Sequence, residues 1–196
     1  MSQSINITGH LSTSERTNSG HSELSMLIRD CIAESPSAQK KLYDLYAPAA
    51  YGIIKRYMYN NDAAAEELLN DSFYKILTRL NQYNFAGAFE GWIRRIVINT
   101  VTDHVRKNIK DEQPHKEVQP EDAYVPSDSV QKLSHKELLI LIHALPDVQR
   151  AVFNLFVFEN YSHKEIATLL NMNENNSRWH LNDARRRLKE KIVIME

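Results

Sequence analysis

The sequence has few of the residues that mark secreted, membrane-spanning or strand-rich proteins. Its one cysteine, Cys31, excludes a disulfide within the chain and is typical of a reducing compartment. Only 5 of the 196 residues are glycine and 6 are proline, and no alternating apolar run indicates a strand. The apolar runs are too short to cross a bilayer, and the N-terminus has no basic segment before an apolar one. We therefore expect a cytoplasmic, all-α protein.

Net charge excludes no class of partner, because 24 basic and 25 acidic residues leave a balance of −1. Composition does divide the chain. Residues 1–21 are rich in Ser, Thr, Asn and Gly, which predicts a disordered tail. Residues 108–129 hold three prolines, six acidic residues and two lysines, which predicts a flexible acidic linker. Two small helical domains are expected on either side of it, at 22–107 and 130–196.

Helical periodicity predicts four segments in the N-terminal domain. Ser22 is expected to cap the first, and Pro36 occupies the first turn of the second, where its missing N–H costs nothing. Pro48 is expected to kink or split that second helix. Asp62 is expected to cap a third helix, and a fourth is expected to follow the loop "NQYNFAGA" and to run to about Lys107. Together they predict a helical bundle.

The C-terminal domain begins with an uninterrupted apolar run at residues 138–142, which predicts a helix buried on nearly all sides. Pro146 lies in the first turn of the next helix. Ser162 and Glu165 then form the S-x-x-E pattern of a capping box, which predicts the start of a short helix. Asn171 ends that helix and suits the left-handed conformation of a tight turn.

A second, longer helix follows this turn, so a helix-turn-helix is predicted. Leu181, Ala184 and Leu188 are spaced to form its buried face. The opposite face carries Asn175, Trp179, Asn182, Asp183 and Arg186, with Arg178 and Arg185 at its flanks. The second helix of such a motif enters the major groove of DNA.

Basic residues are concentrated on this helix. Six of them fall within the fourteen residues from Arg178 to Lys191. Local charge, rather than net charge, is what a phosphate backbone attracts. A solvated helix end is the alternative, because the helix dipole favours cations near the C-terminus. The capped helix and turn just upstream favour DNA binding.

The N-terminal domain contains the pattern AFxxWxxRIxxNxxxDxxR, from Ala88 to Arg106. With the C-terminal helix-turn-helix, this pattern resembles the sigma factors of bacterial RNA polymerase, of the small two-domain extracytoplasmic-function (ECF) type. The resemblance covers about residues 22–107 and 130–193. It implies that the N-terminal domain recognises and melts the minus-ten promoter element, that the C-terminal domain binds the minus-thirty-five element, and that both bind core RNA polymerase. An anti-sigma protein, often membrane-bound, is a common further partner in this family.

The resemblance implies three groups of site residues. The loop residues Tyr83, Asn84 and Phe85 would hold a flipped base, because base–aromatic stacking is worth about 1–3 kcal/mol. The other minus-ten contacts implied are Arg95, Asn99 and Arg106. The polymerase contacts implied, in "EELLNDSF" and just after it, are Leu69, Asn70, Asp71 and Lys75. The minus-thirty-five contacts implied are Asn175, Asn176, Arg178, Trp179, Asn182, Arg185 and Arg186.

Several of these residues have a second interpretation. If residues 81–88 are an ordinary loop between two helices, their aromatic side chains pack into the core. The helix face expected to contact the polymerase has a solvent-exposed face without a partner as its alternative. Arg178 suits a bidentate contact to guanine, and Asn175 and Asn176 suit phosphate or adenine. Trp179 would pack either on DNA or into the core. Ser177, His180 and Asp183 depart from the residue types usual in the family.

No enzyme is expected. The chain has no phosphate-binding Gly-rich loop, no dinucleotide-binding turn and no nucleophile–base pair, and its eight histidines lack the spacing of metal ligands. We therefore expect no catalytic residue, cofactor or metal. Two other classes are considered, a helix-turn-helix regulator that binds duplex DNA alone and a helical protein-interaction module. The first half of the chain lacks the pattern of an effector or receiver domain, and the arginine cluster disfavours the second.

Overall fold

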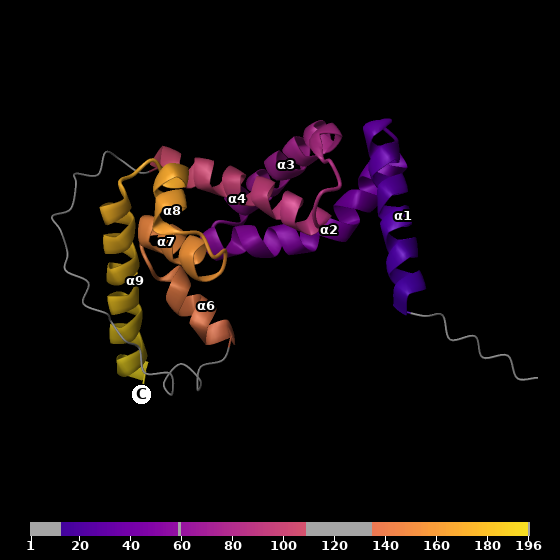
Figure 1. Ribbon diagram of the computed structural model, residues 1–196. Helices are drawn as coiled ribbons and strands as arrows, with labels where there is room; N and C mark the ends of the chain where they lie inside the picture. The colour runs from indigo at the N-terminus through magenta and orange to yellow at the C-terminus, as the bar shows by residue number, and fades with distance from the viewer. Residues whose placement is uncertain (1–12, 59, 109–134, 196) are drawn as a thin grey trace, which may run out of the picture.

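The computed structural model describes residues 13–58, 60–108 and 135–195. The regular elements within these ranges are helices (Figure 1), which confirms the predicted all-α class. The expected linker at 108–129 lies outside the described residues, apart from Asn108 at the end of the fourth helix. The elements are α1 (Thr13–Ile32), α2 (Pro36–Tyr57), α3 (Asp62–Arg79), the 3-10 turn η1 (Leu80–Gln82), α4 (Phe89–Asn108), α6 (His135–His143), α7 (Asp147–Val157), α8 (His163–Leu170) and α9 (Glu174–Met195).

Helix α1 begins earlier than the sequence predicts. It starts at Thr13 rather than near Ser22, and residues 1–12 lie outside the description. Leu27 and Ile28 anchor the helix in the core, at 8% and 1% exposure. Once such a helix is nucleated, each added residue gains a backbone hydrogen bond, so polar residues can extend it.

Helix α2 runs unbroken from Pro36 to Tyr57, so Pro48 does not split it. A proline inside a helix removes one backbone hydrogen bond. Burial of Ala47 and Ala50 on either side of Pro48 stabilises the helix across this position. The α1–α4 core is completed by the apolar faces of α3 and α4, which pack on α2 and on each other.

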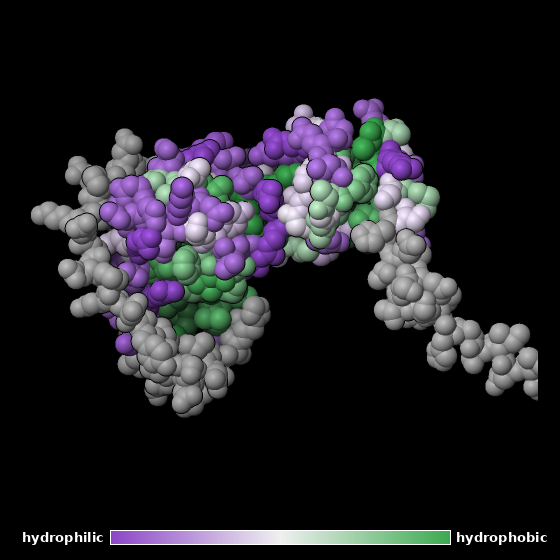
Figure 2. All heavy atoms as spheres, in the orientation of Figure 1, coloured by the Kyte–Doolittle hydropathy of each residue, from purple (hydrophilic) through white to green (hydrophobic). Residues whose placement is uncertain are grey.

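Helix α6 is amphipathic rather than buried on nearly all sides, which corrects the expectation for residues 138–142. Leu141 and Ile142 are 5% and 0% exposed, whereas Ile140 is 51% exposed. An uninterrupted apolar run gives no sign of which side faces water. The buried side packs with Ala184, Leu188 and Ile192 of α9. Figure 2 shows apolar residues gathered over the α6–α7 region, below a hydrophilic area over α8.

The C-terminal helices gather at one end of α2 and α4, and α1 lies at the other end (Figure 1). Helices α6 and α7 contact α2, and α7 and α8 contact α4. One apolar cluster contains residues of both halves, such as Ile54 and Val97 from the first and Leu155 and Ile166 from the second. The two halves are therefore packed directly on each other. None of the described helices is long and apolar enough to cross a membrane.

Candidate nucleic-acid interface

The helix-turn-helix forms as the sequence predicts. Ser162 Oγ accepts from Glu165 N at 3.3 Å, and Glu165 Oε2 accepts from Ser162 N at 2.8 Å, which completes the capping box. The hydrogen bonds from Ser162 lower the pKa of Glu165. Asn171 ends α8 with φ 53° and ψ 49°, the left-handed conformation expected of the turn. Asn173 Oδ1 then accepts from Asn176 N at 2.7 Å and starts α9.

The inner face of α9 is wider and more polar than predicted. Leu181, Ala184 and Leu188 are buried as expected. Asn176 is only 4% exposed, so its side chain faces inward, which contradicts its expected place on the DNA-facing surface. Ser177 and His180 are buried too, and Ser177 Oγ lies 2.9 Å from His163 Nδ1. These positions fall on the same helical stripe as the leucines, so they are core positions that carry polar side chains.

Asp183 is also buried, at 8% exposure, which corrects its expected place on the outer face. Its carboxylate accepts from Gln149 Nε2 at 3.2 Å, Arg186 Nη2 at 2.5 Å and Arg187 Nε at 2.7 Å. Burial raises the pKa of Asp183, but the hydrogen bonds from the two arginines and Gln149 outweigh it and leave the pKa below its usual value. Asp183 thus holds the side chains of Arg186 and Arg187 in place.

The outward strip of α9 consists of residues with exposed or half-buried side chains, namely Asn175, Arg178, Trp179, Asn182, Arg185 and Arg186. Arg178 pairs with Glu174 at 2.5 Å, and Arg186 pairs with Glu190 at 2.7 Å. Ion pairs as exposed as these contribute little to stability, so a phosphate can replace the carboxylate of Glu174 or Glu190. Trp179 is half-buried, and its ring lies edge-on to the ring of His180, with centroids 5.0 Å apart. It therefore lies at the boundary between the core and the surface.

In the loop before α4, the aromatics divide between the core and the surface. Tyr83 packs on Phe89 and Trp92, with ring centroids at 5.0 and 5.7 Å, and its hydroxyl donates to Gly87 O. Phe85 is 52% exposed. Its backbone φ is 58°, a value that residues other than glycine rarely adopt. Asn84 is exposed and accepts from Ala86 N at 3.1 Å. The loop therefore holds Phe85 outward on a base of packed rings.

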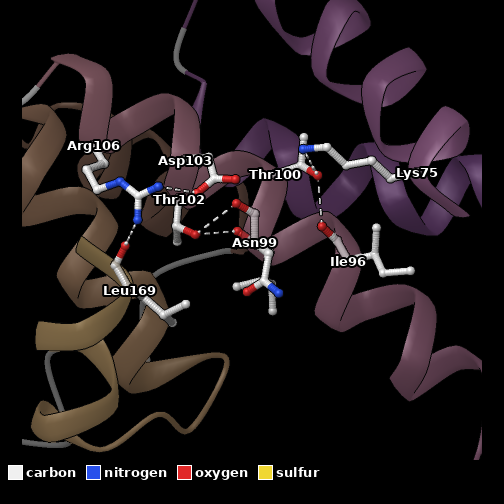
Figure 3. Close-up of polar contacts among 9 residues, drawn as sticks. Lys75, Ile96, Asn99, Thr100, Thr102, Asp103, Arg106 and Leu169 are labelled. Carbon is white, nitrogen blue, oxygen red and sulfur yellow. Dashed lines mark hydrogen bonds and ion pairs between the residues drawn. The ribbon is translucent and has the colours of Figure 1, made fainter. Parts of the chain in front are cut away.

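On α4, the three predicted contacts have exposed side chains on the side toward α8. Arg106 pairs with Asp103 at 2.7 Å and donates to Leu169 O of α8 at 3.3 Å (Figure 3). Arg95 and Asn99 line a cleft of about 440 Å³ between α4 and the α7–α8 connection. The buried hydroxyl of Thr100 donates to Ile96 O within the helix, at 2.9 Å.

The predicted polymerase surface on α3 is partly core. Leu69 is 8% exposed and packs inside the bundle, so it is not available as a contact, contrary to expectation. Lys75 is half-buried and donates to Thr100 Oγ1 at 3.1 Å, which ties α3 to α4 (Figure 3). Asn70 and Asp71 are exposed. Tyr74 lies one helical turn further on, is 72% exposed and shares their face. It was not among the predicted contacts, although it follows Asn70 by four residues and Asp71 by three, the spacing of neighbours on a helix face.

Sequence analysis also missed the contacts between the halves. Glu159 has no exposed side-chain surface and pairs with Arg56 and Arg94. These partners lie 103 and 65 residues away in the chain, and no local pattern joins them. In the described parts of the chain, no group of three or more His, Cys, Asp or Glu side chains is placed to hold a metal ion.

Comparison with known proteins gives matches in both halves. Residues 42–110 match the family Sigma-70 region 2, and residues 135–188 match Sigma-70, region 4. The chain is 27% identical over 157 residues to the ECF RNA polymerase sigma factor SigM of Bacillus subtilis, covering 76% of this chain and 91% of SigM. It is 29% identical over 153 residues to the ECF RNA polymerase sigma factor BldN of Streptomyces coelicolor, covering 76% of this chain but only 58% of BldN. Among solved structures, the sigma factor RpoE of Bartonella quintana, crystallised with the anti-sigma factor NepR, is similar at a TM-score of 0.48 and 17% identity, covering 80% of this chain and 97% of RpoE.

Proposed function

Because the chain belongs to the sigma-70 family, in its ECF group, and acts as a sigma factor that directs transcription initiation, we propose that its two halves contact separate promoter elements through the residues described above. The observation that carries this proposal is the outward strip of α9. It follows a capped helix and a left-handed turn, and it exposes asparagines and arginines on one face.

Helix α9 is proposed to read the minus-thirty-five element. Arg178 is exposed near the start of the helix, where side chains reach base edges, and its planar guanidinium suits guanine O6 and N7. Asn175 and Asn182 lie on the same strip and suit adenine or phosphate. Arg185 and Arg186 lie further along and suit the phosphate backbone. Asn176 is left out of this set because it is buried.

The loop before α4 is proposed to hold a flipped base of the minus-ten element. Phe85 is the exposed ring, and Asn84 beside it offers an amide to a base edge. Arg95, Asn99 and Arg106 would contact the DNA backbone or the non-template strand along α4. The exposed face of α3 that contains Asn70, Asp71 and Tyr74 is proposed to contact core RNA polymerase.

Catalysis is assigned to the polymerase, so the chain is proposed to be a non-enzymatic factor that works in the cytoplasm beside the chromosome. Core RNA polymerase and promoter DNA are its proposed partners. An anti-sigma protein is a third, since RpoE of Bartonella quintana was crystallised with the anti-sigma factor NepR.

Footprinting of the reconstituted holoenzyme tests the assignment of the two halves. We expect protection of an upstream duplex segment together with permanganate-reactive thymines in a separate downstream segment. Phe85→Ala should remove the permanganate signal and keep the upstream protection, and Arg178→Ala should do the reverse. Loss of both signals together in each variant would contradict the division of labour.

A further inference from the structure

A polar cleft lies where the two halves of the chain meet. Its volume is about 440 Å³, which is within the range of sites that hold small molecules. One wall consists of residues of α4 between Gly91 and Asn99, and the other consists of residues 159–161, after α7, together with Glu165 of α8. Because each half supplies one wall, neither half forms the cleft alone.

The arginines at this cleft are not all used by the fold. Arg94 donates from Nε to Glu159 Oε2 at 2.5 Å and from Nη2 to Phe158 O at 3.2 Å, so its guanidinium is held in one orientation. Arg56 also pairs with Glu159, whose side chain has no exposed surface. Two arginines thus neutralise this carboxylate. Arg95 is exposed and makes no ion pair or hydrogen bond with the residues that the structure describes.

The other carboxylate at the cleft, that of Glu165, is held by the start of its own helix. Its Oε2 accepts from Ser162 N at 2.8 Å and from Ser162 Oγ at 2.6 Å. Three arginines are thus grouped with two carboxylates, and the excess positive charge favours an anion. A guanidinium without a partner offers its N–H groups in a planar fork, which matches the oxygens of a phosphate.

The neutral polar groups of the cleft suit hydrogen bonding to the rest of a ligand. The side-chain amide of Asn99 is exposed and makes no hydrogen bond with the described residues (Figure 3). Asn160 is exposed on the opposite wall, with a left-handed backbone at φ 57°. Burial raises the pKa of the Tyr161 hydroxyl and Arg95 lowers it, so these two groups are close enough to interact. Gly91 leaves its end of the cleft open, because a Cβ added there would meet no neighbouring atom within 4 Å.

A buried hydroxyl close to the cleft also lacks a partner. Tyr57, the last residue of α2, is only 2% exposed, and its hydroxyl makes no hydrogen bond with the described part of the chain. Burial raises its pKa, Glu159 raises it further and Arg56 lowers it, so the hydroxyl lies within electrostatic range of the cleft wall. Buried polar groups without a partner are uncommon and mark places where a water molecule or a ligand atom can bind. The hydroxyl is therefore a second sign, independent of the arginines, of a polar ligand.

We propose that the cleft binds a small molecule that carries a phosphate group and is about the size of a nucleoside monophosphate. Arg95 binds the phosphate, with Arg94 beside it, and Asn99, Asn160 and Tyr161 contact the sugar and the base. The inference goes beyond the proposed function, and it does not require α4 to bind DNA. A nucleic-acid strand also carries phosphates, but Asn160 and Tyr161 lie outside the proposed minus-ten contacts, so they distinguish the two sources.

Isothermal titration calorimetry on the full-length chain tests the site, with adenosine monophosphate, inorganic phosphate and adenosine as probes. Adenosine monophosphate should bind at one site and more tightly than inorganic phosphate, and adenosine should give no saturable heat. Arg95→Gln should weaken the binding of adenosine monophosphate on the order of tenfold. Arg79→Gln, at an exposed position on α3 with the same change in charge, is the matched control and should leave the affinity unchanged.

Gly91→Leu tests the cleft without removing a charge. The added side chain should fill the end of the cleft beside α4 and weaken the binding of adenosine monophosphate. Leucine has a higher helix propensity than glycine, so the variant should be at least as stable as the wild type in urea unfolding. Wild-type affinity in this variant would overturn the placement of the ligand.

A short single-stranded DNA separates a free phosphorylated ligand from a nucleic-acid strand. Tyr161→Phe should weaken the binding of adenosine monophosphate and leave the binding of this DNA unchanged. Equal weakening of both would assign the cleft to nucleic acid and overturn the inference. The inference would also be overturned if the wild-type chain showed no saturable binding up to about 10 mM adenosine monophosphate, or if Arg79→Gln weakened binding as much as Arg95→Gln does.

Discussion

The guanidinium of Arg150, on α7, donates through Nε to the backbone carbonyl of Tyr57 at the end of α2, at 2.9 Å. Its Nη1 donates to His143 O and Leu145 O at 3.0 and 2.8 Å. The residue is only 6% exposed. One side chain thus joins α2, the end of α6 and the start of α7, so the fold of the C-terminal half and its docking share a common support.

Arg150→Ala is expected to lower the free energy of unfolding by about 3 kcal/mol, because it removes the guanidinium donor from two buried carbonyls, Tyr57 O and Leu145 O, and from the part-buried His143 O. Urea unfolding followed by circular dichroism measures the change. Arg79→Ala, at an exposed position in the last turn of α3, should change stability by less than about 0.5 kcal/mol. Equal effects of the two substitutions would show that the Arg150 contacts do not stabilise the fold.

His163 makes stability depend on pH. Its ring stacks on Phe156 with centroids 4.7 Å apart, and it meets Ser177 of α9. Burial lowers the pKa of His163 below 6.5, and Arg178 and Arg185 lower it further while Glu174 acts in the opposite direction. The unfolded chain then binds this proton more readily than the folded chain does. Stabilisation is therefore complete above pH 6.5 and is lost as the pH falls.

His163→Gln is expected to reduce the loss of stability between about pH 7.5 and about pH 5.5. Urea unfolding at the two pH values measures it. Part of the loss should remain, because burial also lowers the pKa of His143. His104→Gln, on α4, is the control and should keep the full wild-type loss. The same pH dependence in both variants would exclude His163 as a source.

Phe85→Ala should weaken promoter melting without lowering stability. The side chain is 52% exposed, and alanine adopts the left-handed backbone conformation as readily as phenylalanine does. The substitution should therefore change the free energy of unfolding little. Loss of one base-stacking contact, worth about 1–3 kcal/mol, predicts a reduction of open complexes by roughly one to two orders of magnitude. Leu45→Ala, at a residue 57% exposed on α2, should have no effect. Permanganate reactivity measures opening, and retained reactivity in Phe85→Ala would exclude the ring as the base-holding group.

Arg178→Ala should weaken upstream-element binding in a sequence-dependent way. A bidentate arginine–guanine contact is worth about 1–3 kcal/mol of discrimination, so affinity should fall for the preferred sequence and hardly change for a scrambled one. Fluorescence anisotropy on the two duplexes measures the ratio. An equal loss on both would reassign Arg178 to a phosphate contact.

Local sequence signals predicted the helix-turn-helix well, because its capping box and its left-handed Asn171 depend on neighbours a few residues away. Patterns of polarity failed where a distant partner satisfies a polar group. Asp183 is buried against Gln149, 34 residues earlier, which donates to its carboxylate. Leu69 is core because it shares the apolar stripe of α3 with Phe73 and Ile76.

The docking of the two halves left no trace in the sequence. Arg56 and Glu159 are ordinary charged residues in their own segments, and only the packed structure brings them together, 103 residues apart. Ile140 shows a second limit of prediction from sequence, because an unbroken apolar run does not reveal which of its residues is exposed to solvent. The sequence was thus informative about elements and motifs, and uninformative about contacts between distant elements.

Run-off transcription on genomic promoter fragments, with core polymerase alone and with the chain added, shows whether the chain directs promoter-specific initiation. We expect discrete transcripts only when the chain is present, and their loss when Phe85→Ala replaces the wild-type chain. Transcript patterns identical with and without the chain, despite tight binding of the chain to duplex DNA, would contradict it.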